Sequence, residues 1–157
     1  MAIILSDKEI DDLVQERKLL PEDYRAKIQM RAKTGHKERE LDVKGEGGNE
    51  FRLILRQGTI NPLAFSIILA YRPPNSNQLF RLRRYNGKSH EHSNIIEGEK
   101  FYNFHVHRAT TRYQEIGSNE DSYAEPTDRF SDFNQALSCM VKECGFQIPS
   151  ELQERLL

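Results

Sequence analysis

The sequence predicts a single α+β domain, in which an antiparallel meander of about five strands packs on helices from both ends of the chain. Three observations support this fold class. Apolar residues recur with helical spacing near both ends, polar and apolar residues alternate through the middle, and 157 residues suffice for one core. Within this domain, residues 1–157, we expect a helical N-terminal part (1–35), an antiparallel sheet (36–116) and C-terminal helices (128–157).

Two helices are expected before the sheet. Residues 5–20 begin with a capping box, because Ser6 can cap the first turn while Glu9, three residues later, reaches back to the backbone N–H of the cap. A second helix is expected from Pro21, a residue that suits the first helical turn, to about Lys33.

Five segments in the middle of the chain are predicted to be strands. Their apolar residues alternate with polar ones or form a short run, and turn-forming residues such as "GEGGN", "PPNSN" and Asn86-Gly87 bound them. The predicted strands are residues 38–45, 51–58, 65–72, 80–87 and 100–114, of which the last is the longest.

The C-terminal part is predicted to be a loop followed by helices. Residues 117–127 are polar and have no periodicity, so we expect a loop there. Residues 129–146 have apolar residues at helical spacing, Ser131 or Thr127 to cap the first turn, and Gly145 where the helix would end. A short last helix is expected at residues 149–157.

The composition argues against several classes of protein. The formal net charge is −1, so the overall charge gives no indication of nucleic-acid binding. No apolar run is long enough to span a bilayer, and the first residues lack the basic start of a signal peptide. Cys139 and Cys144 lie five residues apart in a predicted helix and cannot face each other, so we expect reduced thiols, a cytoplasmic protein and no membrane partner.

Charge is unevenly distributed along the chain. No Asp or Glu occurs between Phe51 and His90, where seven Arg or Lys residues lie, whereas the segment after Gln114 is mainly acidic. Two interpretations stay open. The pattern reflects chance and solubility, or the basic stretch forms a surface for a phosphate-bearing or acidic partner.

Strand alternation predicts which side chains share a face of the sheet. Successive side chains of a strand point to opposite sides, so Val106 is expected on the helix-covered side and His105 and His107 on the other. The same alternation in the neighbouring strands turns four arginines toward the histidine side: Arg52, Arg56, Arg81 and Arg83. The open face is therefore predicted to carry both histidines and arginines.

The first functional hypothesis is an RNA-directed protein, a metal-independent endoribonuclease of toxin type that needs no cofactor. One imidazole would take the proton of a 2′-hydroxyl, another would protonate the leaving oxygen, and a cation would stabilise the phosphorane. The candidate catalytic residues are His90, His92, His105 and His107. The candidates for binding phosphate or another part of the ligand are Arg84, Tyr85, Lys88, Arg112 and Tyr113, with the tyrosines stacking on bases.

Two alternatives stay open beside this hypothesis. The two His-x-His pairs could supply four nitrogen ligands to the metal of a hydrolase, or three together with Glu91 or Glu97. The same face could instead be a docking surface for nucleic acid or an acidic protein such as an antitoxin, masked by the acidic segment in the free protein. Solvated polar residues on one face of an antiparallel sheet also need no function at all.

Two stretches, "FRLRRYNGKSHEHSN" and "FYNFHVHRATTRYQ", resemble a family of small bacterial and prophage proteins of unknown function. The resemblance rests on a similar series of Arg-Tyr-Asn-Gly, His-x-His, Phe-His-x-His and Ala-Thr-x-Arg-Tyr motifs, and runs from about Phe51 to near Phe146. It carries no activity onto individual residues. Some small bacterial proteins of this size act on RNA as toxins or in phage defence, and this analogy favours the ribonuclease hypothesis.

Overall fold

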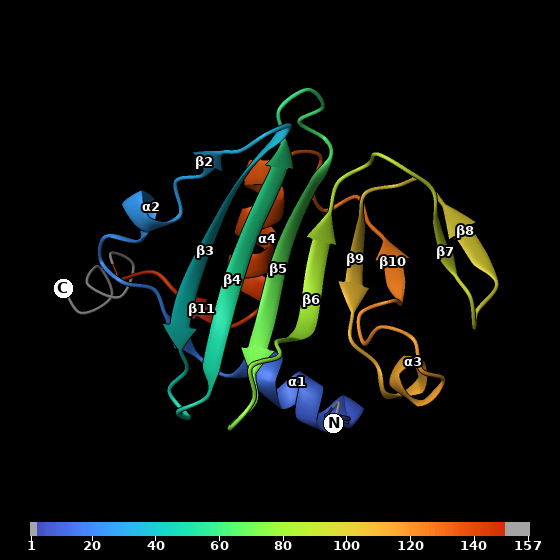
Figure 1. Ribbon diagram of the computed structural model, residues 1–157, viewed down its shortest axis with the longest axis horizontal. Coiled ribbons are helices and arrows are strands. Elements are labelled where there is room, and N and C mark those ends of the chain that lie inside the picture. The colour runs from blue at the N-terminus through green and yellow to red at the C-terminus, as the bar shows by residue number, and fades with distance from the viewer. Residues whose placement is uncertain (1–2, 150–157) are drawn as a thin grey trace.

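The computed structural model describes residues 3–149 and contains one antiparallel seven-stranded sheet in the order β10-β9-β6-β5-β4-β3-β2. The helices α1 and α4 lie behind this sheet in Figure 1, on the same face, and the other face has no helix over its central strands. The predicted α+β class and antiparallel meander are confirmed. The strands are β2 (Arg31–Ala32), β3 (His36–Lys44), β4 (Glu50–Gly58), β5 (Phe65–Arg72), β6 (Phe80–Asn86), β9 (His105–Arg108) and β10 (Ala124–Pro126).

The first helix, α1 (Asp7–Gln15), begins at the predicted capping box. The Ser6 hydroxyl accepts a hydrogen bond from the backbone N–H of Glu9, and the Glu9 carboxylate accepts one from the backbone N–H of Ser6. The helix ends before residue 20, where the prediction placed its end. Residues Lys18–Leu19 form the short strand β1, which pairs in parallel with β11 (Phe146–Gln147).

The second predicted helix is mostly absent. Only α2 (Tyr24–Lys27) is helical, and β2 follows it and pairs with the edge strand β3. None of the residues of α2 is buried. Because most helical stability in proteins comes from burying an apolar face, a stripe this thin does not sustain the longer helix.

The last long helix, α4 (Phe133–Glu143), lies inside its predicted range. Its N-cap is Asp132, whose side chain accepts from the backbone N–H of Gln135, in place of the expected Ser131 or Thr127. Gly145 has a φ of +75°, the left-handed conformation with which many helices end. The predicted helix at 149–157 lies outside the described residues apart from Pro149.

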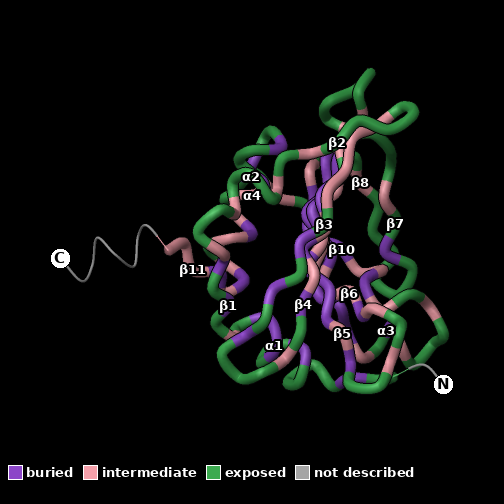
Figure 2. Tube along the Cα trace, turned by 60° about the vertical axis from the view of Figure 1, so that its left-hand side comes forward, coloured by how far each residue is buried: buried purple, intermediate pink, exposed green. Residues whose placement is uncertain are grey.

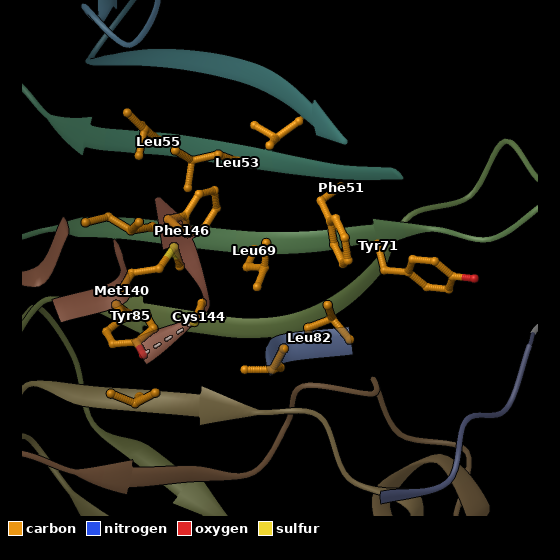
Figure 3. Close-up of a cluster of buried hydrophobic side chains, with 14 of the residues drawn as sticks. Phe51, Leu53, Leu55, Leu69, Tyr71, Leu82, Tyr85, Met140, Cys144 and Phe146 are labelled. Atoms are coloured by element: carbon orange, nitrogen blue, oxygen red, sulfur yellow. Dashed lines mark hydrogen bonds between the residues drawn. The ribbon is translucent and has the colours of Figure 1, made fainter. Parts of the chain in front are cut away.

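The hydrophobic core lies between the sheet and its two helices. Figure 3 shows Tyr85 beside Met140 of α4 and Cys144 at its C-cap, and Phe51 near Tyr71 at the other end of the cluster. Figure 2 shows the buried residues following the sheet, while most of the connecting loops are exposed. Both cysteines are free thiols, as expected. Among residues 3–149, no helix combines the length and apolar character that a membrane crossing requires.

An irregularity in β6 alters the predicted faces. The register between β5 and β6 shifts at Leu69/Ala70, so that Arg81 lies opposite Ala70 while Arg83 lies opposite Leu69. Arg83 therefore points to the helix-covered side, where its guanidinium lies 3.5 Å from the Tyr85 hydroxyl. The prediction that Arg83 faces outward is wrong, because a bulge adds a residue and reverses the alternation beyond it.

Residues 100–114, predicted as one long strand, form three separate elements. They are β8 (Glu99–Phe101), β9 (His105–Arg108) and the short helix α3 (Thr111–Glu115). The strand β8 pairs with β7 (His92–Asn94) in a hairpin that forms its own two-stranded sheet. The predicted loop 117–127 contains β10, which pairs with β9 and extends the main sheet beyond residue 116.

Candidate metal centre

The strand β9 places two histidines on the face of the sheet opposite the helices. His105 lies across from Asn86 and His107 across from Arg84, while Val106 between them lies across from Tyr85 in the core. The predicted alternation of this strand is thus observed. Both histidines are nevertheless buried, with 1% and 3% of their surface exposed. An additional element must therefore cover them.

That element is the β7–β8 hairpin, which is attached to the free edge of the sheet by one side chain. Asn94 accepts from the backbone N–H of Ala124 at 3.0 Å and donates to the Ala124 carbonyl at 2.7 Å. Because β10 is the edge strand, these backbone groups have no neighbouring strand to bind, and Asn94 provides their hydrogen bonds instead. Nearby, Glu97 pairs with the Arg112 guanidinium at 2.8 Å and accepts from the Tyr113 hydroxyl at 2.6 Å.

The hairpin brings a third histidine against the two on β9. The ring centroid of His92 lies 5.3 Å from that of His105 and 4.8 Å from that of His107, and the last two centroids are 4.9 Å apart. One possible ligand nitrogen from each ring lies within 4.8 Å of the other two. Imidazoles bound to a tetrahedral zinc ion have centroids about 5 Å apart and nitrogens about 3.4 Å apart. The ring centroids are therefore at the separation of zinc ligands, and the nitrogens, which lie within 4.8 Å of one another, would have to move closer together to bind one ion.

Backbone carbonyls determine which nitrogen of each β9 histidine carries the proton. The Nδ1 of His105 is 2.8 Å from the Asn103 carbonyl, and the Nδ1 of His107 is 2.7 Å from the Asp121 carbonyl. A carbonyl oxygen only accepts, so both Nδ1 atoms donate and both Nε2 atoms keep a free lone pair. The Nε2 of His105 is buried and has no hydrogen-bond partner within residues 3–149.

His92 has the opposite tautomer for the same kind of reason. Its Nε2 lies 2.8 Å from the Oδ1 of Asn94, and that oxygen is identified as the acceptor by its bond from the Ala124 N–H. The Nε2 of His92 therefore donates, and its Nδ1 keeps the lone pair. Holding the outer N–H of a histidine with a fixed acceptor is the usual way in which proteins orient metal ligands.

Burial keeps the two β9 histidines neutral. Burial is the largest cause, and together with the nearby Arg84 guanidinium it lowers the pKa of His105 to about 4 and that of His107 to about 2. A neutral imidazole is the form that binds a metal ion. A histidine that stays neutral at pH 7 is, by contrast, unsuited to donate a proton to a leaving group.

The Arg84 side chain belongs to a buried ion-pair cluster behind His107. Its Nε lies 3.3 Å from one carboxylate oxygen of Asp121, and an Arg81 nitrogen lies 3.4 Å from the other. Burial raises the pKa of Asp121, and the two guanidinium groups oppose that rise. The Arg84 Nη2 lies 3.4 Å from the Nδ1 and 3.5 Å from the Nε2 of His107, so the guanidinium lies against this ring at the limit of hydrogen-bond distance.

A pocket of about 320 Å³ opens beside this cluster and is lined in part by His92, His107, Arg84 and Tyr113. His90 also lines the pocket, is exposed, and has its Nδ1 3.0 Å from the Ser89 hydroxyl. It lies outside the group of three histidines whose nitrogens come within 4.8 Å of one another among residues 3–149. Of the four predicted histidines, three thus form one cluster and the fourth lies at its entrance.

The other predicted site residues are placed differently. The ring of Tyr85 is fully buried on the helix-covered face, so the prediction that it stacks on a ligand beside the histidines is wrong. Tyr113 is buried and Arg112 is engaged by Glu97, while Lys88 is exposed but outside the pocket. Neither Glu91 nor Glu97, the predicted alternative ligands, belongs to the cluster.

Two residues that orient the cluster, Asn94 and Asp121, were not predicted. Asn94 acts on a residue 30 positions away, and Asp121 binds His107 through its backbone carbonyl, which any residue possesses. Neither role leaves a pattern in the local sequence, so no sequence signal could have identified them.

Comparison with known proteins identifies the family of the chain but assigns no activity to it. The chain matches DUF6978, described as a family of unknown function, over residues 5–145. This match begins well before Phe51, where the sequence resemblance was expected to start, and it includes α1. No curated protein and no solved structure matches the chain. Because the match covers far more than half of its length, the chain belongs to DUF6978, a family of unknown function.

Proposed function

We propose that this protein is a metal-dependent hydrolase whose single divalent ion is bound by His92, His105 and His107. One observation carries the proposal. Three imidazole rings have centroids at the separation of zinc ligands, and one ring nitrogen of each is held by its own oxygen acceptor. Surface histidines without a function do not need such an arrangement, whereas metal ligands commonly have it.

Zinc is the metal that this ligand set fits best. Three neutral nitrogen ligands and one position left for water or substrate are typical of catalytic zinc sites. The open position would face the pocket, because His92 and His107 line it while His105 lies behind them. The ion would supply a bound water that is acidic enough to form hydroxide near neutral pH.

The side chains around the pocket provide the remaining parts of a hydrolytic reaction. His90 can take the proton of the water as its oxygen bonds to the substrate, and return that proton to the leaving oxygen when the scissile bond breaks. Arg84 faces the same pocket and can stabilise negative charge on the reacting group. Asp121 holds Arg84 and, through its backbone carbonyl, His107, so the two are positioned together.

The burial of the histidines argues against the metal-independent ribonuclease. That mechanism needs one imidazole that is protonated at neutral pH and two that touch the RNA. His105 and His107 are buried beneath the hairpin, and burial lowers the pKa of each far below neutrality. The same covering argues against a docking surface formed by these two residues, since a partner could not reach them.

Zinc titration of the metal-free protein tests the proposal. We expect calorimetry to give one ion per chain, and Co²⁺ to give the visible absorption of a tetrahedral site. His92→Gln, His105→Gln and His107→Gln should each weaken zinc binding by about a hundredfold or more, since each removes a ligand from the first shell. His90→Gln and His36→Gln are matched controls and should retain zinc, because both histidines lie outside the cluster.

Two results would contradict the proposal. The first is a protein that binds no zinc, or binds it equally well after the three substitutions. The second concerns labelled RNA. Cleavage that survives a chelator and disappears in His105→Gln/His107→Gln would restore the acid–base ribonuclease and its RNA partner.

A further inference from the structure

We propose that the substrate of this site carries two phosphate groups, one beside the metal at Arg84 and the other at Arg56, in a groove that crosses the open face of the sheet. The position of the reacting phosphate rests on the proposed function, whereas the groove and its charge do not depend on the metal.

The groove consists of two adjoining pockets. The pocket beside the histidines is continued by a second one of about 240 Å³, and the two share Ser66, Asn86 and His90. The second pocket extends to Arg56 and to His36 at the start of β3. The histidine cluster is therefore one end of a longer binding surface.

Strand register gives the direction and length of this groove. Arg56 lies opposite Ser66, Ser66 opposite Asn86, and Asn86 opposite His105, so these four residues form a row across β4, β5, β6 and β9. Neighbouring strands lie about 4.8 Å apart, so the row spans roughly 14 Å from Arg56 to His105. This length accommodates a ligand with two separated charged groups and exceeds the size of a single phosphate.

The charge of the groove selects for anions. None of the residues lining either pocket is an Asp or Glu, although the chain contains 24 of them. Arg56 makes no ion pair with any residue from 3 to 149, whereas Arg52, four positions away on the same face of β4, is paired with Glu40 and Asp42. Glu38 lies opposite Arg56 on β3, and its carboxylate is 3.5 Å from the Nε2 of His36. An exposed guanidinium that makes no ion pair within residues 3–149, in a pocket that no carboxylate lines, is suited to bind an external phosphate.

Neutral hydrogen-bonding groups lie between the two arginines. The Asn86 Oδ1 accepts from the Ser66 hydroxyl at 2.9 Å, and the Asn86 amide nitrogen donates to no acceptor within residues 3–149. Because Asn86 lines both pockets, this nitrogen is available to the ligand segment that joins the two phosphates. Along the groove, the guanidinium of Arg84 is therefore followed by the amide of Asn86 and then by the guanidinium of Arg56.

Binding of two ligands with paired phosphates tests this inference. The probes are fructose 1,6-bisphosphate and a 5′-phosphorylated trinucleotide, with inorganic phosphate as the single-anion reference, and calorimetry on both metal-free and zinc-loaded protein gives their affinities. We expect at least one probe to bind more tightly than inorganic phosphate. Arg56→Gln should lower the affinity for that probe by about tenfold, as expected for the loss of one charged contact. The same substitution should change the affinity for inorganic phosphate by no more than about twofold.

Arg72→Gln is the matched control, because Arg72 lies on β5, the strand next to that of Arg56, and lines neither pocket. Tight binding of the trinucleotide alone would identify a nucleic-acid substrate. Tight binding of the sugar bisphosphate alone would identify a small metabolite as the substrate. Either result supports the inference. Equal affinity for one and two phosphates, or equal effects of Arg56→Gln and Arg72→Gln, would overturn it. Arg56-dependent binding by a protein that takes up no zinc would overturn the metal centre and leave the groove assigned.

Discussion

At the scale of single residues, the geometry of the histidine cluster depends most on Asn94. Its side chain bonds both backbone groups of Ala124 and accepts the ring proton of His92. One amide therefore attaches the hairpin to the sheet and fixes the tautomer of a proposed ligand. This dual role makes Asn94 a positioning residue, since it contacts neither the pocket interior nor the site where the ion would bind.

Substitution of Asn94 should weaken metal binding without removing a ligand. We expect Asn94→Ala to lower zinc affinity by about 10- to 100-fold, the usual effect of losing an outer-shell partner. A competition titration against a chromophoric chelator measures this change. The control is Asn134→Ala, since Asn134 is exposed on α4 behind the sheet. Equal affinities in the two variants would show that the hairpin is held in place by its other contacts.

The sequence correctly predicts which face of the sheet a side chain points to where the strand is regular. Alternation correctly placed His105 and His107 opposite to Val106, because β9 is regular over these residues. It placed Arg83 wrongly because the bulge depends on pairing with β5. The burial of the histidines was equally beyond a strand pattern, since a separate hairpin produces it.

At the scale of elements, the long ones follow from local sequence and the short ones do not. The helices α1 and α4 and the strands β3 to β6 each contain seven or more residues with a periodic pattern or a recognisable cap. By contrast, β7, β8 and β10 have three residues each. Elements this short are stabilised by tertiary contacts such as those of Asn94 and Glu97, which local sequence does not encode.

Lys18 joins the C-terminal ends of α1 and α4 and should contribute strongly to stability. Its buried ammonium lies within 3.0 Å of the carbonyls of Leu13, Val14, Glu16 and Cys144. These are carbonyls that the helices leave unpaired at their ends. We expect Lys18→Met to lower the free energy of unfolding by about 3 kcal/mol, because these buried acceptors would lose their donor. Urea denaturation measures the difference.

The control for this prediction is Lys8→Met in α1, the helix whose C-terminal carbonyls Lys18 binds. Lys8 is exposed, and its one ion pair within residues 3–149 is with Asp12 one turn away, so its loss should leave the unfolding midpoint unchanged. If Lys18→Met were as stable as Lys8→Met, hydration or rearrangement would have to satisfy the carbonyls, and the link between the two helices would carry no net stability.

At the scale of the whole molecule, the basic and acidic segments of the chain neutralise each other. Arg81 and Arg84 of the basic stretch both pair with Asp121 of the acidic segment, and Arg81 also pairs with Glu120. What faces an external ligand is a groove with Arg56, unpaired among residues 3–149, at one end and Arg84, which shares its charge with Asp121, at the other, and this suits a small anion better than a long polyanion.

The buried histidines should also make the metal-free protein sensitive to mild acid. The pKa of His105 is lowered by burial to about 4, whereas an unfolded histidine titrates near 6.5. Between these values the unfolded chain binds a proton that the folded chain does not, so stability is complete above pH 6.5 and falls as the pH falls toward 4. From pH 7.5 to 4.5, His105 alone should account for about 2 to 3 kcal/mol of lost stability.

Urea unfolding at the two pH values, with a chelator present, measures this loss. In His105→Gln, the loss of unfolding free energy between pH 7.5 and 4.5 should be about 2 to 3 kcal/mol smaller than in the wild type, because glutamine does not titrate. In His36→Gln, whose ring lies outside the cluster, the loss should equal that of the wild type. An identical decrease in His105→Gln and the wild type would mean that the folded protein takes up the proton as readily as the unfolded chain. The hairpin would then open in mild acid while the sheet stayed folded, since only loss of its cover would rehydrate this ring.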